Sequence, residues 1–227
     1  MNLEGKIVAI TGGSKGLGKA LAIAFGNKGA KVVIGARSKE ELEATASELG
    51  IASIVCDVTR ESDVQNLADE VLKKHGRIDI WINDAGVWLP HASIEETNWQ
   101  RVHEMFEVNI FGTIYGSKAA LIQMRKQESG LIINILSTSA LDGRPRSSGY
   151  CASKYAAAGF TKSLRKEVEG TDIKVFGIYP GGMQTSFFDE KKPGEFEEFM
   201  SADFVASKII ENLTGDSPEE EQVIKRP

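Results

Sequence analysis

The sequence predicts an α/β protein in three layers, a doubly wound fold with a parallel sheet in the middle. Short apolar segments alternate with segments of helical period along the 227 residues. The apolar segments are nearly continuous rather than alternating in polarity, which is typical of strands covered by helices on both faces. Successive β-α units with right-handed crossovers then place helices on either side of the sheet.

Each expected element follows from this pattern. In chain order the expected strands are 6–11, 31–36, 52–56, 78–83, 131–136 and 173–179, with a short edge strand near 222–226. The expected helices are 18–28, 39–49, 61–75, about 99–127, 150–169 and 203–213. Ser38 with Glu41 resembles a capping box, and Thr59 precedes the start of another helix. Glycines stand where helices should end, at Gly29, Gly50, Gly76 and Gly170.

Composition favours a soluble globular chain with one domain. The residues are 41% hydrophobic and 26% charged, and no linker, repeat or low-complexity block divides positions 1–227. A net charge of −5 disfavours nucleic acid as the main partner. The N-terminal MNLEGKIVAI lacks a signal-peptide layout, and no apolar run has the length of a membrane span. We therefore expect a cytoplasmic protein.

The few cysteines and histidines indicate neither a disulfide nor a metal site. Cys56 and Cys151 form no paired motif, which fits a reducing compartment. Three histidines are scattered without the spacing of metal ligands, at His75, His91 and His103. We expect no metal.

A glycine loop follows the first expected strand. Gly12, Gly16 and Gly18 precede a helix, where free N–H groups and the helix dipole favour a phosphate. The loop nearly matches the triphosphate motif G-x-x-x-x-G-K-[ST], but Ala20 stands where that motif needs a hydroxyl for Mg²⁺. Asp57, at a strand end, is the best remaining support for a triphosphate. A tight turn without ligand is a further alternative, and a dinucleotide is favoured.

Five motifs occur in one order along the chain: TGGSKGLG at 11–18, NDAG at 83–86, Asn109, Ser137 and YCASK at 150–154. Together they resemble the short-chain dehydrogenase/reductase family over about residues 3–185. The resemblance implies a Rossmann-like fold and a catalytic group of Asn109, Ser137, Tyr150 and Lys154. It also implies cofactor contacts from Gly12, Ser14, Lys15, Gly16, Leu17, Gly18, Arg37, Ser38, Asp57, Val58, Asn83, Ala85, Gly86, Tyr150, Lys154, Pro180, Gly181 and Thr185. The NDAG motif departs from the family's N-N-A-G at Asp84, which leaves the role of that second position open.

The catalytic group has a chemical rationale. Tyr150 and Lys154 would share one face of a helix, where an ammonium about 6 Å from the phenol should lower its pKa by about 2 units. The resemblance makes the Ser137 hydroxyl the donor to the substrate carbonyl, although Ser139 stands close by. It also implies that Asn109 opens its helix and holds a water that relays protons to Lys154. The alternatives are a chance Tyr–Lys pair, a capping serine and a solvent-facing asparagine.

The adenine end of the cofactor site predicts NADP(H). An NAD site places an acid at the end of the second strand, but this end reads GARS and carries Arg37. Lys15 adds a second cation, and two cations without an acid favour a 2′-phosphate.

The predicted function is therefore an NADP(H)-dependent oxidoreductase that moves a hydride between nicotinamide and a carbonyl or secondary alcohol. In cells it would reduce a ketone, either a 3-oxoacyl-like compound or another small carbonyl. The alternative is a non-catalytic NADP(H)-sensing protein on the same fold.

The sequence also predicts how the substrate is enclosed and how subunits associate. The substrate pocket should be walled by 88–91, 141–146 and the segment after Thr185. Residues 186–200 should form a mobile lid, unless their aromatic side chains are permanent core. Small residues in helix 150–169 favour a homo-oligomer, either a dimer or a tetramer.

Overall fold

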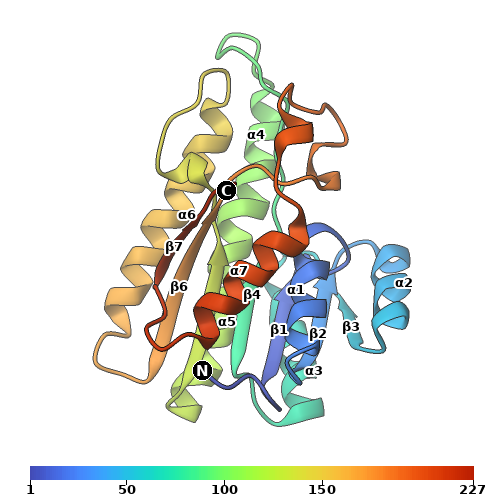
Figure 1. Ribbon diagram of the computed structural model, residues 1–227, viewed down its shortest axis with the longest axis vertical. Helices are drawn as coiled ribbons and strands as arrows, with labels where there is room; N and C mark the ends of the chain where they lie inside the picture. Colours follow the sequence, from blue (N-terminus) through green and yellow to red (C-terminus); the bar gives the residue numbers. More distant parts are fainter.

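The computed structural model describes residues 1–227 and is built on a seven-stranded parallel sheet (Figure 1). The strands are β1 (Ile7–Thr11), β2 (Lys31–Ala36), β3 (Ala52–Val55), β4 (Ile80–Asn83), β5 (Gly130–Ile135), β6 (Ile173–Pro180) and β7 (Glu221–Ile224). Their order in the sheet is β3-β2-β1-β4-β5-β6-β7. The predicted doubly wound α/β fold with a parallel sheet is confirmed.

Helices cover both faces of this sheet. They are α1 (Gly16–Gly26), α2 (Lys39–Leu49), α3 (Glu61–His75), α4 (Trp99–Phe106), α5 (Gly112–Gln127), α6 (Ser148–Glu167) and α7 (Ala202–Thr214). One core of 27 buried residues joins the sheet to α1, α2 and α7, and Figure 1 shows α1 and α7 on the near face. A second core of 19 buried residues joins the sheet to α3, α5 and α6. No helix is long and apolar enough to cross a lipid bilayer.

The central strands bring the sequence motifs together. All residues of β1 and β4 are buried, which explains why both segments are continuously apolar until their last positions. The two strands pair in parallel with Thr11 opposite Asn83. The glycine loop and the NDAG turn therefore leave the sheet side by side, at the point where the strand order reverses.

The long helix expected at 99–127 is interrupted. α4 ends at Phe106, a π-helical turn covers Glu107–Phe111, and α5 starts at Gly112. Asn109 lies in this turn and is 2% exposed. The expectation that Asn109 opens its helix is consistent with this geometry, because π turns interrupt the regular hydrogen-bond ladder.

The expected capping box at Ser38 does not form. Ser38 is the N-cap residue of α2, but its side chain makes no capping hydrogen bond. The Glu41 carboxylate is instead 3.4 Å from the Lys15 ammonium, so an ion pair replaces the reciprocal bond to the helix start. α3 begins at Glu61 after Arg60, while the Thr59 hydroxyl donates to Asp57.

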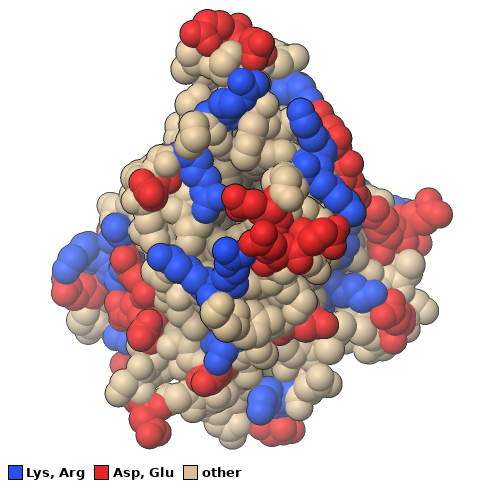
Figure 2. Space-filling view, turned by 45° about the horizontal axis from the view of Figure 1, so that its top comes forward, with Lys and Arg blue, Asp and Glu red and all other residues tan.

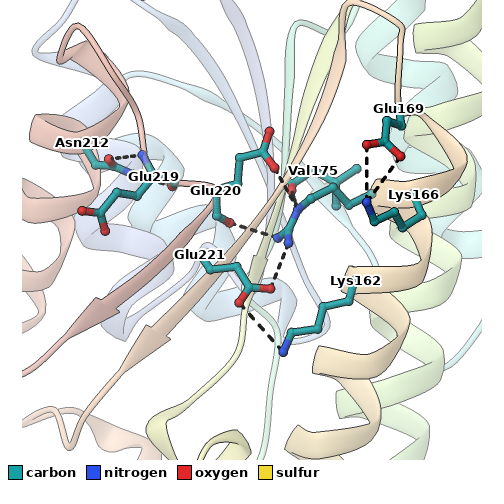
Figure 3. Close-up of polar contacts among 9 residues, drawn as sticks. Lys162, Lys166, Glu169, Val175, Asn212, Glu219, Glu220 and Glu221 are labelled. Carbon is teal, nitrogen blue, oxygen red and sulfur yellow. Dashed lines mark hydrogen bonds and ion pairs between the residues drawn. The ribbon is translucent and has the colours of Figure 1, made fainter.

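The last strand is fastened to the sheet by Arg165 of α6. Its guanidinium donates to the Val175 carbonyl at 2.8 Å, the Glu220 carbonyl at 3.0 Å and the Glu221 carboxylate at 2.9 Å. Figure 3 shows Glu220 and Glu221 turned toward α6, with Lys162 reaching Glu221 from the preceding turn of that helix. These contacts tie β7 to β6 and α6 although β7 has only four residues.

Candidate functional site

A cavity of about 900 Å³ lies at the carboxyl edge of the sheet. Its walls come from the segments that follow β1 to β6, which is where an open α/β sheet binds ligands. Figure 2 looks toward this end of the molecule and shows acidic and basic side chains interleaved, with no large field of one sign. The cavity therefore has the size and position of a small-molecule site.

The glycine loop forms one wall of this cavity. Gly12 has a φ of 75°, and a Cβ atom there would lie 2.7 Å from the Ala85 backbone nitrogen. A Cβ atom on Gly18 would lie 2.3 Å from the Gly12 carbonyl oxygen. Glycine is required at both positions because the loop packs directly on the NDAG turn and on itself. α1 starts at Gly16, so its N-terminus opens into the cavity and fits a phosphate.

The far end of the cavity carries the residues expected at the adenine and its ribose. Arg37 and Ser38 line the wall after β2, and Asp57 and Val58 line it after β3. Asp57 is held by the Thr59 backbone and hydroxyl, which donate to its carboxylate at 3.0 and 2.8 Å. Arg37 has no acidic partner within 4.0 Å, so its charge is available to a ligand.

The other end of the cavity brings Ser137, Tyr150 and Lys154 together. Ser137 follows β5 and accepts a hydrogen bond from the Ser139 backbone at 3.1 Å. The Lys154 ammonium lies 6.0 Å from the centre of the Tyr150 ring and donates to the Ile135 carbonyl at 3.1 Å. Three groups able to exchange or donate a proton therefore face one space.

Burial dominates the electrostatics of this group. It raises the pKa of Tyr150 to about 12, although hydrogen bonding with Ser137 and the charge of Arg144 act in the opposite direction. It lowers the pKa of Lys154 to about 8, against an opposing effect of the Asp84 carboxylate. The expected lowering of the phenol pKa is thus wrong for this structure, because loss of water around the phenol outweighs the nearby charges.

Most of the residues expected to bind the cofactor line the cavity, but Gly18 and Asn83 do not, nor does Asn109. The Asn109 amide accepts from the Val87 nitrogen at 2.8 Å and donates to the Val87 carbonyl at 3.0 Å. Asn83 lies beneath the cavity floor in a network of buried polar side chains. In this structure these three residues support the walls from behind.

The expected lid consists of two short 3₁₀ turns, Ser186–Phe188 and Phe196–Glu198. Phe187 packs against Tyr150 with ring centres 6.2 Å apart, and Phe188 packs against Trp88 at 5.0 Å. No residue of either turn is fully buried, whereas Met200 at the end of the segment belongs to the main core. A mobile lid and a permanently docked segment both remain open.

The substrate end of the cavity differs in part from the expectation. Trp88, His91 and Arg144 line it, whereas Leu141 and Arg146 do not. Leu141 is 45% exposed on the surface, so its side chain is directed to solvent rather than to the cavity. Lining residues that the motifs did not indicate include Glu41 and Val108. No local pattern marks them, since they reach the cavity through tertiary packing.

An open parallel sheet with a cavity at its switch point is typical of α/β proteins that bind nucleotides. Residues 6–195 match the family model described as short chain dehydrogenase, and the chain belongs to that family.

Relatives extend over most of the molecule. A 3-oxoacyl-[acyl-carrier-protein] reductase of Thermotoga maritima is 33% identical over 87% of this chain and 82% of its own. An alcohol dehydrogenase from Thermococcus sibiricus, solved with 5-hydroxy-NADP, is 29% identical, covers 99% of both chains and has a TM-score of 0.89. A 3-ketoacyl-(acyl-carrier-protein) reductase from Brucella melitensis, solved with NADH, is 25% identical, covers 98% of this chain and 97% of its own and has a TM-score of 0.91.

Proposed function

We propose that this chain is an NADP(H)-dependent carbonyl reductase, with residues 1–227 acting as a single catalytic domain in the cytoplasm. The observation that carries the proposal is the meeting of Ser137, Tyr150 and Lys154 in the cavity that the glycine loop also lines. The dinucleotide fits this cavity, because the cradle made by Gly12 and Gly18 would be filled by any Cβ atom. When bound, the cofactor would supply the hydride.

The side chains would divide the remaining work. The Ser137 hydroxyl would donate a hydrogen bond to the substrate carbonyl oxygen, and the Tyr150 hydroxyl would donate the proton. Burial keeps the pKa of Tyr150 well above neutral, so the phenol is protonated, as reduction requires. The Lys154 ammonium, in the first turns of α6, would hold the nicotinamide ribose and stabilise charge that develops on Tyr150.

The preference for NADP(H) rests on the adenine end of the cavity. Arg37 lines the wall at the end of β2 without an acidic partner, and Lys15 lines the same cavity from the glycine loop. Lys15 is paired with Glu41 at 3.4 Å, so Arg37 is expected to contribute most of the discrimination between NADP(H) and NAD(H). The solved relatives include one complex with an NADP derivative and one with NADH, so they favour neither cofactor for this chain. The proposed preference therefore depends on Arg37 and Lys15.

The cavity walls favour a ketone with an apolar body. Trp88, Phe187 and Phe188 form a connected aromatic surface beside Tyr150. A carbonyl carbon placed at Tyr150 would therefore carry its substituents along aromatic faces, while Arg144 offers one cation to a polar end. This supports a small ketone or a 3-oxoacyl-like compound as substrate.

We also propose a homodimer formed through α5 and α6. Ala152, Ala156 and Gly159 lie exposed on one face of α6, and Tyr155 beside them is 47% exposed. Small side chains allow the equivalent helices of two subunits to approach closely. Phe111, in the π turn before α5, adds an exposed aromatic ring to the same proposal.

The test of the proposed function is NADPH oxidation, followed by absorbance, with a panel of β-keto esters, aromatic ketones and aldehydes. We expect turnover with at least one ketone, and Tyr150→Phe should retain less than about 1% of kcat while binding NADPH like the wild type. Tyr155→Phe, an exposed tyrosine of the same helix, is the matched control and should stay active.

The alternative, a cofactor-sensing protein without turnover, predicts a different result. NADPH would bind with ordinary affinity, no carbonyl in the panel would be reduced, and Tyr150→Phe would change nothing. That outcome would overturn the proposed reductase.

A further inference from the structure

The substrate end of the cavity holds an arginine without an acidic partner. Arg144 lines this end, and its guanidinium donates to the Thr138 hydroxyl at 3.2 Å. It is not among the arginines that form ion pairs, which are Arg77, Arg101, Arg146, Arg165 and Arg226. The bond to Thr138 occupies one N–H group and leaves the other donors of the guanidinium free for a ligand.

Thr138 fixes this guanidinium close to the reacting groups. It directly follows Ser137, whose hydroxyl is proposed to hold the carbonyl oxygen, and both residues line the cavity. Burial raises the pKa of Tyr150, and the charge of Arg144 acts against that rise, so the guanidinium is near enough for the phenol to be influenced by it. An anion bound to Arg144 can therefore belong to the same small molecule whose carbonyl group is reduced.

The neighbouring His91 lies among several cations. It lines the cavity, and its ring packs edge-on against Trp88 with ring centres 5.4 Å apart. Burial lowers the pKa of His91, and the charges of Arg144, Arg146 and Lys191 lower it further. This imidazole is therefore neutral at neutral pH, and the wall of the cavity around it is electropositive before a ligand binds.

The acids near this wall do not compensate Arg144. Glu96 lies 3.4 Å from the Arg146 guanidinium and pairs with it. Glu195 lines the cavity from the segment 186–200, but it is exposed and forms no ion pair with Arg144. Water and salt screen an exposed carboxylate, so the positive charge of Arg144 remains available to a substrate.

We propose that Arg144 is a specificity-determining residue that binds an anionic end of the substrate, either a carboxylate or a phosphate. The inference rests on the proposed function and names the class of ketone, one with an apolar body and a negatively charged end. A planar guanidinium can donate two parallel hydrogen bonds to either anion. The apolar body would lie along Phe187 and Phe188, which pack in sequence beside Tyr150.

The charged end would take no part in the reduction. The carbonyl carbon gains the hydride from NADPH, its oxygen gains the proton from Tyr150, and the anion stays bound to Arg144 throughout. Binding at both ends would hold the carbonyl group in one orientation between the hydroxyl groups and the cofactor.

The first test compares charged ketones with neutral analogues of the same shape. We would measure kcat/KM with NADPH for an α-keto acid and a γ-keto acid with aryl bodies, each against its primary amide. A keto phosphonate against its neutral diester distinguishes phosphate from carboxylate as the preferred anion. The wild type should prefer the charged member of at least one pair by tenfold or more, because charge-assisted hydrogen bonds are roughly twice as strong as neutral ones.

Arg144→Met should lower this ratio of charged to neutral kcat/KM at least tenfold, and Arg144→Lys should retain part of the preference. Any effect of the substitution on Tyr150 acts on both members of a pair and cancels in the ratio. Arg146→Met is the matched control, because Arg146 is a cation of the same loop that does not line the cavity. It should leave the ratio nearly unchanged. Equal kcat/KM for charged and neutral ketones in the wild type, or equal losses in the two variants, would overturn the inference.

A second readout does not depend on turnover. Calorimetry of the complex with NADPH would give the Kd of an aryl hydroxy acid and of its primary amide, with the cofactor occupying its own phosphate sites. The acid should bind more tightly in the wild type, and Arg144→Met should remove this advantage. If the wild type reduced no ketone but bound the acid through Arg144, the proposed reductase would fail and the anion site would stand. If neutral and charged ketones were reduced equally well, the reductase would stand and the role of Arg144 would fail.

Discussion

Replacing Asn83 with alanine should destabilise the fold without removing a cofactor contact. The side chain is 4% exposed and lies below the cavity floor. Its carbonyl oxygen accepts from the Trp81 indole at 2.8 Å. Its amide donates to the Ser117 hydroxyl at 3.0 Å and to the Asn134 carbonyl oxygen at 2.8 Å. The substitution leaves all three partners buried and without these bonds.

The expected loss of stability follows from these contacts. Each buried hydrogen bond contributes about 1 kcal/mol net, so the three together predict a loss of about 3 kcal/mol in the free energy of unfolding. For a domain of this size that corresponds to a fall in Tm of roughly 6–12 °C. The void left by the side chain should add to this loss, to the extent that the surrounding side chains do not relax into it.

The assay is urea unfolding of Asn83→Ala followed by circular dichroism, with the NADPH affinity of the folded variant measured in parallel. Asn27→Ala is the matched control, because Asn27 is exposed at the end of α1. It should change stability by less than about 0.5 kcal/mol. A loss of less than about 1 kcal/mol for Asn83→Ala, or a large loss of NADPH affinity at unchanged stability, would refute the assignment of Asn83 to structural support.

Four further predictions follow from the site and the surface. Arg37→Asp should lower the NADPH:NADH ratio of kcat/KM at least tenfold, about 1.4 kcal/mol, and an unchanged ratio would remove the basis for NADP(H) preference. In the apoprotein, Asp84 has a folded pKa of about 7 against an ordinary value of 3.8, so its contribution to stability is lost as the pH rises through that interval. Tm should therefore fall less between pH 4 and pH 7 in Asp84→Asn than in the wild type, and parallel curves would contradict this. Amides of 186–200 should exchange fast in the apoprotein and slow with NADPH and substrate, whereas equal protection would mean a closed segment. Light scattering at micromolar concentration should give twice the 24.7 kDa of one chain, and a monomeric mass would exclude the dimer.

The sequence determined the fold class and the location of the site. Continuous apolar segments indicated a sheet covered on both faces, and the parallel seven-stranded sheet has that arrangement. The glycine loop and the YCASK segment were visible because each is local in the chain, and a local motif specifies its own backbone. Their meeting at one edge also followed from the sequence, since carboxyl ends of parallel strands share an edge.

Tertiary structure alone decided what surrounds each of these residues. No local sequence pattern around Asn83 predicts Ser117 or Asn134 as its hydrogen-bond partners. Likewise, no pattern around Ser38 predicts that Glu41 pairs with Lys15. Burial is the main reason, because it depends on segments far apart in the chain that close over a group. It reversed the pKa shift expected for the Tyr150 phenol, and it raises the pKa of Asp84, which nothing in the motif itself predicts.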